Sequence, residues 1–246
     1  MDSQAIATLP EHEQQAHEHP DYVRHHFASA DQQRETANFG MWLFLLTEIM
    51  FFSGLFAAYL IYRNWYYPAF VAGSHYMIIW AGTLNTAVLI CSSFTMAMGV
   101  YSAEMRNRKA LIRWLSLTLL LGFVFLGIKA YEWHAEWVEH HVPGLNFSIE
   151  DFTHVNPAYP ADKPLSPDMA EKTQTYFSLY FAMTGMHALH MCIGCGILIF
   201  LIFQAWGGRY TNGHMNTVEN FGLYWHFVDI VWIFLYPLLY LISRHQ

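Results

Sequence analysis

Five long apolar stretches constrain this chain of 246 residues more than any other feature of its sequence. A helix needs about 20 mainly apolar residues to cross the hydrocarbon core of a bilayer. Charged residues make up only 13% of the chain, whereas a soluble domain carries about 25%. We therefore predict an all-α, polytopic membrane protein with a bundle of five transmembrane helices, at about residues 39–62, 77–101, 112–137, 174–204 and 220–243.

The segment before the first apolar stretch differs from the rest of the chain. Residues 1–38 are polar and rich in histidine, and they lack the apolar region of a cleavable signal peptide. The sequence thus divides into this tail and a membrane domain over residues 39–246. The tail histidines suggest either metal binding or a solvated tail on the membrane surface. We favour the solvated tail, because no tight ligand spacing is visible among His12, His17, His19, His25 and His26.

Two further properties narrow the function classes. The net charge is −7, which makes nucleic acid an unexpected partner. The three cysteines, Cys91, Cys192 and Cys195, lie inside apolar stretches, and we interpret them as small packing residues. A disulfide between positions three apart on one helix is geometrically unfavourable.

The distribution of lysine and arginine predicts the orientation in the membrane. The tail and the second and fourth loops share one side, with Arg24, Arg34, Arg106, Arg108, Lys109, Arg113 and Arg209. The opposite side carries Arg63, Lys163, Lys172 and Arg244. We expect the N-terminus inside and the C-terminus outside, so that the long acidic loop of residues 138–173 faces out.

Ionisable side chains inside the membrane are costly and usually face protein or water. Glu48 lies about 14 Å along the first helix, since each residue adds about 1.5 Å, and this places it near mid-membrane. Its sequence neighbours offer only Thr47 and Ser53 as polar groups. The alternatives are a proton-active carboxyl and a neutral carboxyl hydrogen-bonded to a facing helix.

Lys129 and Glu132 lie three apart in the third stretch and share a helix face. Their position near the helix end allows the lysine to extend toward the headgroups. We favour a structural pair over a catalytic one.

Two further pairs have the same spacing: His187 with His190, and His226 with Asp229. Such residues on two helices suit a metal site or axial haem ligation. They equally suit interhelical hydrogen bonds that lock the helices together. Small residues nearby indicate close helix packing, namely Gly122, Gly127, Ala182, Gly185, Ala188, Gly194 and Gly196.

Three segments resemble subunit III of the haem-copper respiratory oxidases. The first is WLFLLTEIMFFSGLFAAY at 42–59, where Glu48 falls on an intramembrane glutamate of the family. The second is YFAMTGMHALHMCIG at 180–194, which contains His187 and His190. The third is ENFGLYWHFVDIVWIFLY at 219–236, which contains Glu219, Trp225, His226 and Asp229. Glu132 in KAYEW also fits the pattern.

The resemblance implies an all-helical subunit that carries no haem or copper of its own. Those cofactors belong to partner subunits, with subunit I as the direct contact and subunit II and membrane lipids as further partners. It implies a role in the stability, proton uptake and sustained turnover of the catalytic subunit in aerobic respiration. Lys129, Glu132, His187, His190, Glu219, His226 and Asp229 then form a structural polar network, without metal.

The chain begins at what is the third helix of the seven-helix form, so it resembles the short five-helix bacterial form. That implies a location in the bacterial inner membrane. One wall of the family's lipid cleft is missing, which leaves lipid binding in question. Gln204 stands where some members place a lipid-binding arginine, with Arg209 as a substitute and Trp225 as a further lipid contact.

Several functions remain open at this point. Within the family, the oxidase accepts electrons from cytochrome c or from quinol, and some nitric-oxide reductases have similar subunits. The acidic outer loop favours a basic cytochrome c and a proton-pumping cytochrome c oxidase. Outside the family, two alternatives remain. One is a cytochrome b anchor with haem on two of His187, His190 and His226, and the other is a transporter that uses Glu48 and Lys129.

Overall fold

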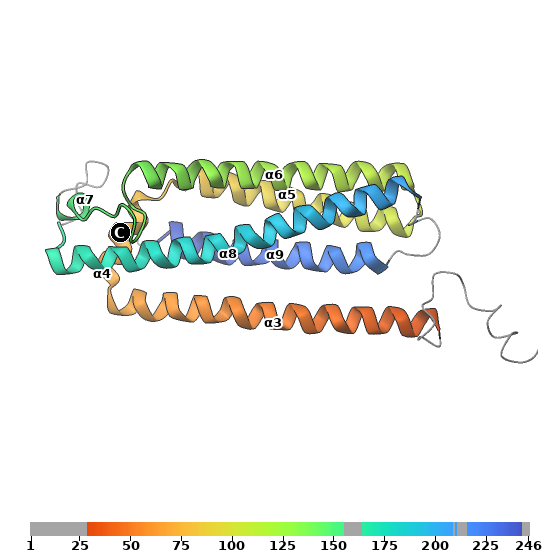
Figure 1. The fold of residues 1–246 in the computed structure, drawn as a ribbon, viewed down its shortest axis with the longest axis horizontal. Helices are drawn as coiled ribbons and strands as arrows, with labels where there is room; N and C mark the ends of the chain where they lie inside the picture. Colours follow the sequence, from red (N-terminus) through yellow and green to blue (C-terminus); the bar gives the residue numbers. More distant parts are fainter. Residues whose placement is uncertain (1–28, 155–163, 209, 211–215, 243–246) are drawn as a thin grey trace, which may run out of the picture.

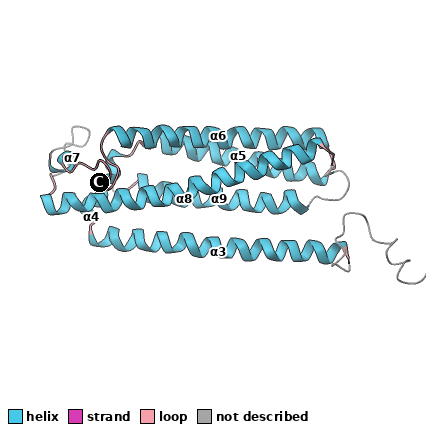
Figure 2. Ribbon diagram, in the orientation of Figure 1, coloured by secondary structure: helices cyan, strands magenta, loops and turns pink. Residues whose placement is uncertain are grey.

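A computed structural model of the chain describes residues 29–154, 164–208, 210 and 216–242. In this part of the chain there is no strand (Figure 2), so the predicted all-α class is confirmed. Five of the helices are long and apolar enough to cross a membrane: α3, α5, α6, α8 and α9. In chain order, the described elements are α3 (Ala30–Trp65), α4 (Tyr67–Tyr76), α5 (Ile79–Glu104), α6 (Arg108–Val138), α7 (Glu150–Thr153), α8 (Pro167–Trp206) and α9 (Asn216–Tyr240).

Several helices extend beyond the predicted bounds. Helix α3 begins at Ala30, inside the segment predicted to be a tail, because the Ser29 hydroxyl accepts a hydrogen bond from the Gln32 amide at 3.1 Å and caps the helix. Helix α8 begins at Pro167, where proline favours the first turn. A search for apolar stretches finds only the part of a helix that lies in lipid. The polar turns at the helix ends are therefore missed. The histidine cluster at 12–26 lies outside the described residues.

The connection between the first two predicted spans contains a short helix. Residues 67–76 form α4, which packs against α8 (Figure 1). Its Gly73 faces the ring of Tyr176, and an added Cβ would lie only 2.5 Å from that ring. A short helix without charge beside a long one therefore closes this end of the bundle.

Helix α3 runs along the outside of the bundle and touches it through one stripe (Figure 1). Leu45, Phe52 and Tyr59 are buried on it at seven-residue intervals, and Glu48 lies between the first two. This repeat keeps one face of a helix against its neighbours, here α8 and α9. The opposite face, with Leu43 and Met50, is exposed and apolar.

The other four long helices pack around Trp225 of α9, which has no exposed surface. Its ring lies against Gly122 of α6 and Gly194 of α8, where an added Cβ would come within 3.1 Å of it at each position. Its indole nitrogen donates a hydrogen bond to the Ser92 hydroxyl of α5 at 2.9 Å. Of the predicted packing glycines, Gly127 and Gly196 meet nothing within 4 Å, so their assignment as close-approach positions was wrong.

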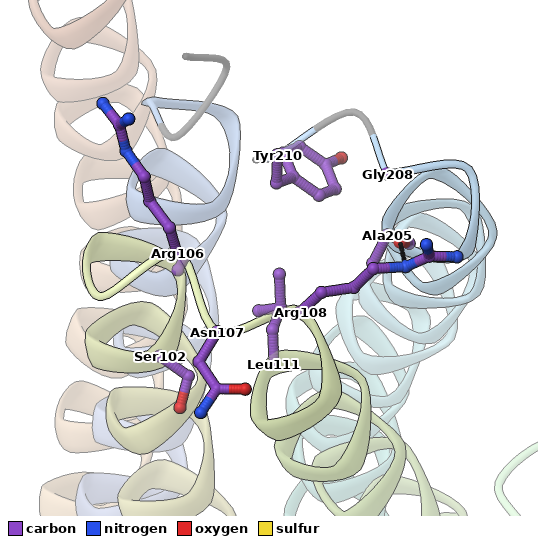
Figure 3. A pocket seen from close by; sticks show the side chains of 9 residues that line it. Ser102, Arg106, Asn107, Arg108, Leu111, Ala205, Gly208 and Tyr210 are labelled. Atoms are coloured by element: carbon purple, nitrogen blue, oxygen red, sulfur yellow. Dashed lines mark hydrogen bonds between the residues drawn. The ribbon is translucent and has the colours of Figure 1, made fainter. Parts of the chain in front are cut away.

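Side chains from other helices satisfy the free carbonyls at two helix ends, where the last four carbonyls lack partners within the helix. Tyr59 and Tyr176 donate to the Leu238 and Leu239 carbonyls at the end of α9, at 2.5 and 2.8 Å. At the other end of the bundle, Arg108 donates to the Ala205 carbonyl at 3.0 Å (Figure 3). It also donates to the Trp206 carbonyl. These contacts hold the ends of α8 and α9 in place.

The packing around Trp225 predicts opposite outcomes for two substitutions on α8. Gly194→Val forces a branched side chain into the Trp225 ring, and overpacking of this kind typically costs about 1–3 kcal/mol. Gly196→Val is the matched control, because it faces open space. We expect a lower thermal unfolding temperature of the detergent-solubilised protein for Gly194→Val only. Equal temperatures for the two variants would contradict the proposed close contact.

Candidate functional site

The intramembrane carboxyl of Glu48 pairs with a histidine from another helix. His190 of α8 places its Nε2 atom 3.0 Å from the Glu48 carboxylate. The Nδ1 atom of the same ring lies 2.8 Å from the Met186 carbonyl. Glu48 does not pair with its sequence neighbours Thr47 and Ser53. The Thr47 hydroxyl donates to the Phe44 carbonyl instead.

These contacts define where the protons are. A carbonyl only accepts hydrogen bonds, so Nδ1 of His190 carries a proton and donates it to Met186. In a neutral imidazole Nε2 is then an acceptor, and Glu48 must donate to it as a carboxylic acid. The alternative is a carboxylate against an imidazolium. The two residues therefore share one proton, which can lie on either side of a 3.0 Å contact.

A cleft of about 560 Å³ is lined in part by this pair. Gln33, Asn216 and Asn220 line it near the beginnings of α3 and α9. The remaining walls include apolar side chains such as Phe44 and Ile193. A cleft with both polar and apolar walls suits an amphipathic occupant or ordered water.

The second polar centre surrounds Lys129 of α6, which is 2% exposed. Its ammonium lies 3.2 Å from the Glu132 carboxylate and donates to the hydroxyls of Tyr180 and Tyr240 at 3.0 and 2.7 Å. Both hydroxyls also donate to the Glu132 carboxylate, Tyr180 at 2.7 Å. The lysine therefore does not extend to the headgroups as we expected, because tyrosines of α8 and α9 complete a buried network around it.

The intramembrane histidines and Asp229 do not face one common site. His226 directs Nδ1 to the Ser93 hydroxyl of α5 at 2.7 Å, and His190 faces Glu48. Both nitrogens of His187 lack a hydrogen bond within the described residues, and its ring packs instead on Phe125 and Trp232, with centroids 5.3 and 5.1 Å away. Asp229 is 3% exposed, and its oxygens likewise make no hydrogen bond within the described part of the chain.

The remaining predicted site residues have different surroundings. Glu219 forms an exposed ion pair with Arg34 at 3.5 Å, which ties α9 to α3. Trp225 has no surface to offer a lipid, so we do not retain it as a lipid contact. Gln204 accepts a hydrogen bond from Tyr210 at 2.6 Å. Arg209 lies outside the described residues.

Sequence reasoning missed several residues of these centres. Tyr180 and Tyr240 carried no signal, because tyrosines are common in this chain and only the fold brings them to Lys129. It also missed a group near the end of α6, where ligand atoms of Glu136, Glu139 and His141 lie within 4.8 Å of one another. The spacing of that group, with a histidine two and five residues after the acids, is visible in the sequence.

The fold and these centres define a multi-pass membrane protein with polar contacts between its helices. The chain matches the family described as Cytochrome c oxidase subunit III over residues 21–142 and 168–244. It belongs to this family, and is therefore a subunit III of a haem-copper oxidase, a multi-subunit oxidoreductase complex of the respiratory chain.

Similar proteins occur with both kinds of oxidase. Cytochrome c oxidase subunit 3 of Thermostichus vulcanus is 29% identical over 99% of this chain and 98% of its own length. The protein of the same name from Synechocystis sp. is 32% identical over 83% of this chain and 75% of its own. Cytochrome bo(3) ubiquinol oxidase subunit 3 of Pseudomonas aeruginosa is 27% identical over 97% of this chain and 99% of its own length.

We expect the stability of the bundle to depend strongly on the charge balance of the buried network around Lys129. Lys129→Met leaves the Glu132 carboxylate buried without its cation, and breaking such a pair costs about 3–5 kcal/mol. We expect this loss in the free energy of unfolding, measured by titration from mild detergent into dodecyl sulfate. The double variant Lys129→Met/Glu132→Gln should recover most of it, because a neutral amide oxygen still accepts from both tyrosines.

Arg34→Gln serves as the control, since it removes one side of an exposed ion pair that is worth about 0–1 kcal/mol. A loss for Lys129→Met no larger than that of Arg34→Gln would mean that the buried network does not stabilise the bundle.

Proposed function

We propose that this chain is a non-redox accessory subunit of a proton-pumping oxidase in a bacterial inner membrane. It carries no catalytic centre, and the haems and copper belong to partner subunits. It binds subunit I directly and contacts subunit II or other small subunits of the complex. Its role is to support the stability, proton uptake and sustained turnover of the catalytic subunit.

The Glu48–His190 pair is the observation that carries this proposal. A carboxyl that shares one proton with an imidazole can pass that proton on without leaving a lone charge in lipid, where an uncompensated charge is costly. The pair lines the same cleft as polar residues near the beginnings of α3 and α9. We propose that protons or water from the membrane surface reach the pair through this cleft.

The exposed face of α3 supports a contact with another subunit next to this pair. Leu43, Leu46 and Met50 are all more than half exposed on it. A second groove of about 580 Å³, lined by Phe52, Phe227 and other apolar residues, runs between α3 and α9. We propose bound phospholipid as its occupant and subunit I as the partner of the α3 face.

The charge distribution supports our proposals for the orientation and the electron donor. We propose the N-terminus on the cytoplasmic side and the C-terminus outside, from the positive residues near the loop at 105–107. The outer segment 138–173, which includes the first turns of α8, then presents acidic groups that attract a basic cytochrome c electrostatically: Glu139, Glu150, Asp151, Asp162, Asp168 and Glu171. The second candidate donor is quinol, because a ubiquinol oxidase subunit is among the similar proteins.

Glu48→Gln tests the role of the shared proton. The amide keeps the shape and can donate to His190, but it cannot exchange a proton. We expect normal assembly and initial turnover, and a several-fold smaller number of turnovers before the purified oxidase inactivates. Glu35→Gln on the exposed end of the same helix is the matched control. Unchanged assembly, activity and operational lifetime in Glu48→Gln would show that the pair has no such role.

The electron donor has a separate test. The oxidase purified through a tag on this chain should consume oxygen with reduced cytochrome c, and the rate should fall as salt screens the acidic loop. Oxygen consumption with ubiquinol alone would assign the chain to a quinol oxidase instead.

A further inference from the structure

His141 is a buried histidine surrounded by acidic groups, and the proton-sharing role proposed above does not involve it. It lies just after α6, at the end of the bundle that also holds α7 (Figure 1). Its Nδ1 atom is 2.9 Å from the Glu136 carboxylate and 3.7 Å from that of Glu139. Its Nε2 atom is 3.6 Å from the Asp151 carboxylate. The side chain of His141 is 1% exposed.

The local backbone builds this arrangement. His140 adopts a left-handed conformation with φ of 60°, which turns the chain back on the last turn of α6. The His141 amide then donates to the Glu136 carbonyl at 3.0 Å. The His141 ring stacks on Phe177 of α8, with centroids 4.9 Å apart. The imidazole is therefore held in one orientation by α6 on one side and α8 on the other.

The cluster holds more acidic groups than cationic ones. Three carboxyl groups face one imidazole, which supplies at most one positive charge. Glu136 is 1% exposed, so burial disfavours its charged form unless a cation lies beside it. Among the described residues no lysine or arginine forms an ion pair with these three carboxylates, and no hydrogen bond reaches Nε2 of His141.

We propose that Glu136, Glu139 and His141 form a site for a divalent transition metal, with Zn²⁺ as the best match. Two ligand atoms about 2.1 Å from a tetrahedral zinc ion lie about 3.4 Å apart. The two observed distances from Nδ1 to the carboxylates, 2.9 and 3.7 Å, lie on either side of that value. Binding replaces the Nδ1 proton by the metal and releases it to solvent.

Asp151 completes the site as an orienting group. A metal-bound histidine typically donates its other ring nitrogen to a carboxylate, which fixes the ring and its tautomer. Nε2 of His141 lies 3.6 Å from the Asp151 carboxylate, and we propose that metal binding draws the two into a hydrogen bond. Three protein ligands leave a fourth position for water, and Glu139, at 54% exposed, gives access from solvent. Imidazole favours zinc and its neighbours over magnesium and calcium, which prefer all-oxygen sites.

The test measures zinc retained by the purified complex. The complex is purified through a tag on this chain, incubated with Zn²⁺, passed through a desalting column and analysed by mass spectrometry for metals. The variants are Glu139→Gln, which removes an exposed ligand, and Asp151→Asn, which removes the orienting carboxylate. Glu150→Gln is the matched control, because it removes one exposed charge next to Asp151 but no ligand. Tail histidines and partner metals are common to all variants.

We expect the wild type and Glu150→Gln to retain one more zinc ion per complex than Glu139→Gln. Asp151→Asn should weaken zinc binding by about 10–100-fold, the usual effect of losing an orienting partner. X-ray absorption at the zinc edge should show nitrogen and oxygen ligands for the extra ion. Equal zinc content in all four proteins, or an extra ion bound through sulfur, would overturn the site.

Discussion

The ammonium of Lys129 lies inside a bundle that must itself fit a bilayer, and the surrounding structure is arranged to compensate that charge. Glu132 supplies the counter-charge from the same helix, while Tyr180 and Tyr240 bring hydroxyls from α8 and α9. A charge left alone in lipid would draw water or move to the surface. The network therefore fixes α6, α8 and α9 in one register, and that register positions the other polar contacts.

One of those contacts is Glu48–His190, which joins the peripheral helix to the bundle. Helix α3 is otherwise held by an apolar stripe and by side chains such as Tyr59, whose hydroxyl binds a carbonyl at the end of α9. The histidine is positioned in turn, because Tyr224 of α9 donates to its backbone carbonyl at 2.8 Å. The position of the Glu48 carboxyl between α3 and α8 thus depends on the packing of the whole bundle. The outer face of α3 stays apolar and exposed.

The sequence predicted the five spanning helices, because twenty apolar residues in a row have few other stable environments. It also predicted that Lys129 and Glu132 share a face, since spacing by three does so on any helix. It did not predict that His190 faces Glu48 or that two tyrosines enclose Lys129, because these depend on how helices far apart in sequence are placed. Helix α4 was missed because its ten residues are too few to span a bilayer and its aromatics resemble interfacial loop residues.

We propose that this subunit works beside the redox centres and holds none itself. A reduced-minus-oxidised visible spectrum tests it, taken on the complex purified through a tag on this chain and again on the chain separated from its partners. We expect haem bands from the complex and none from the separated chain. Haem retained by the separated chain would contradict it, and would make His187, His190 and His226 candidate ligands.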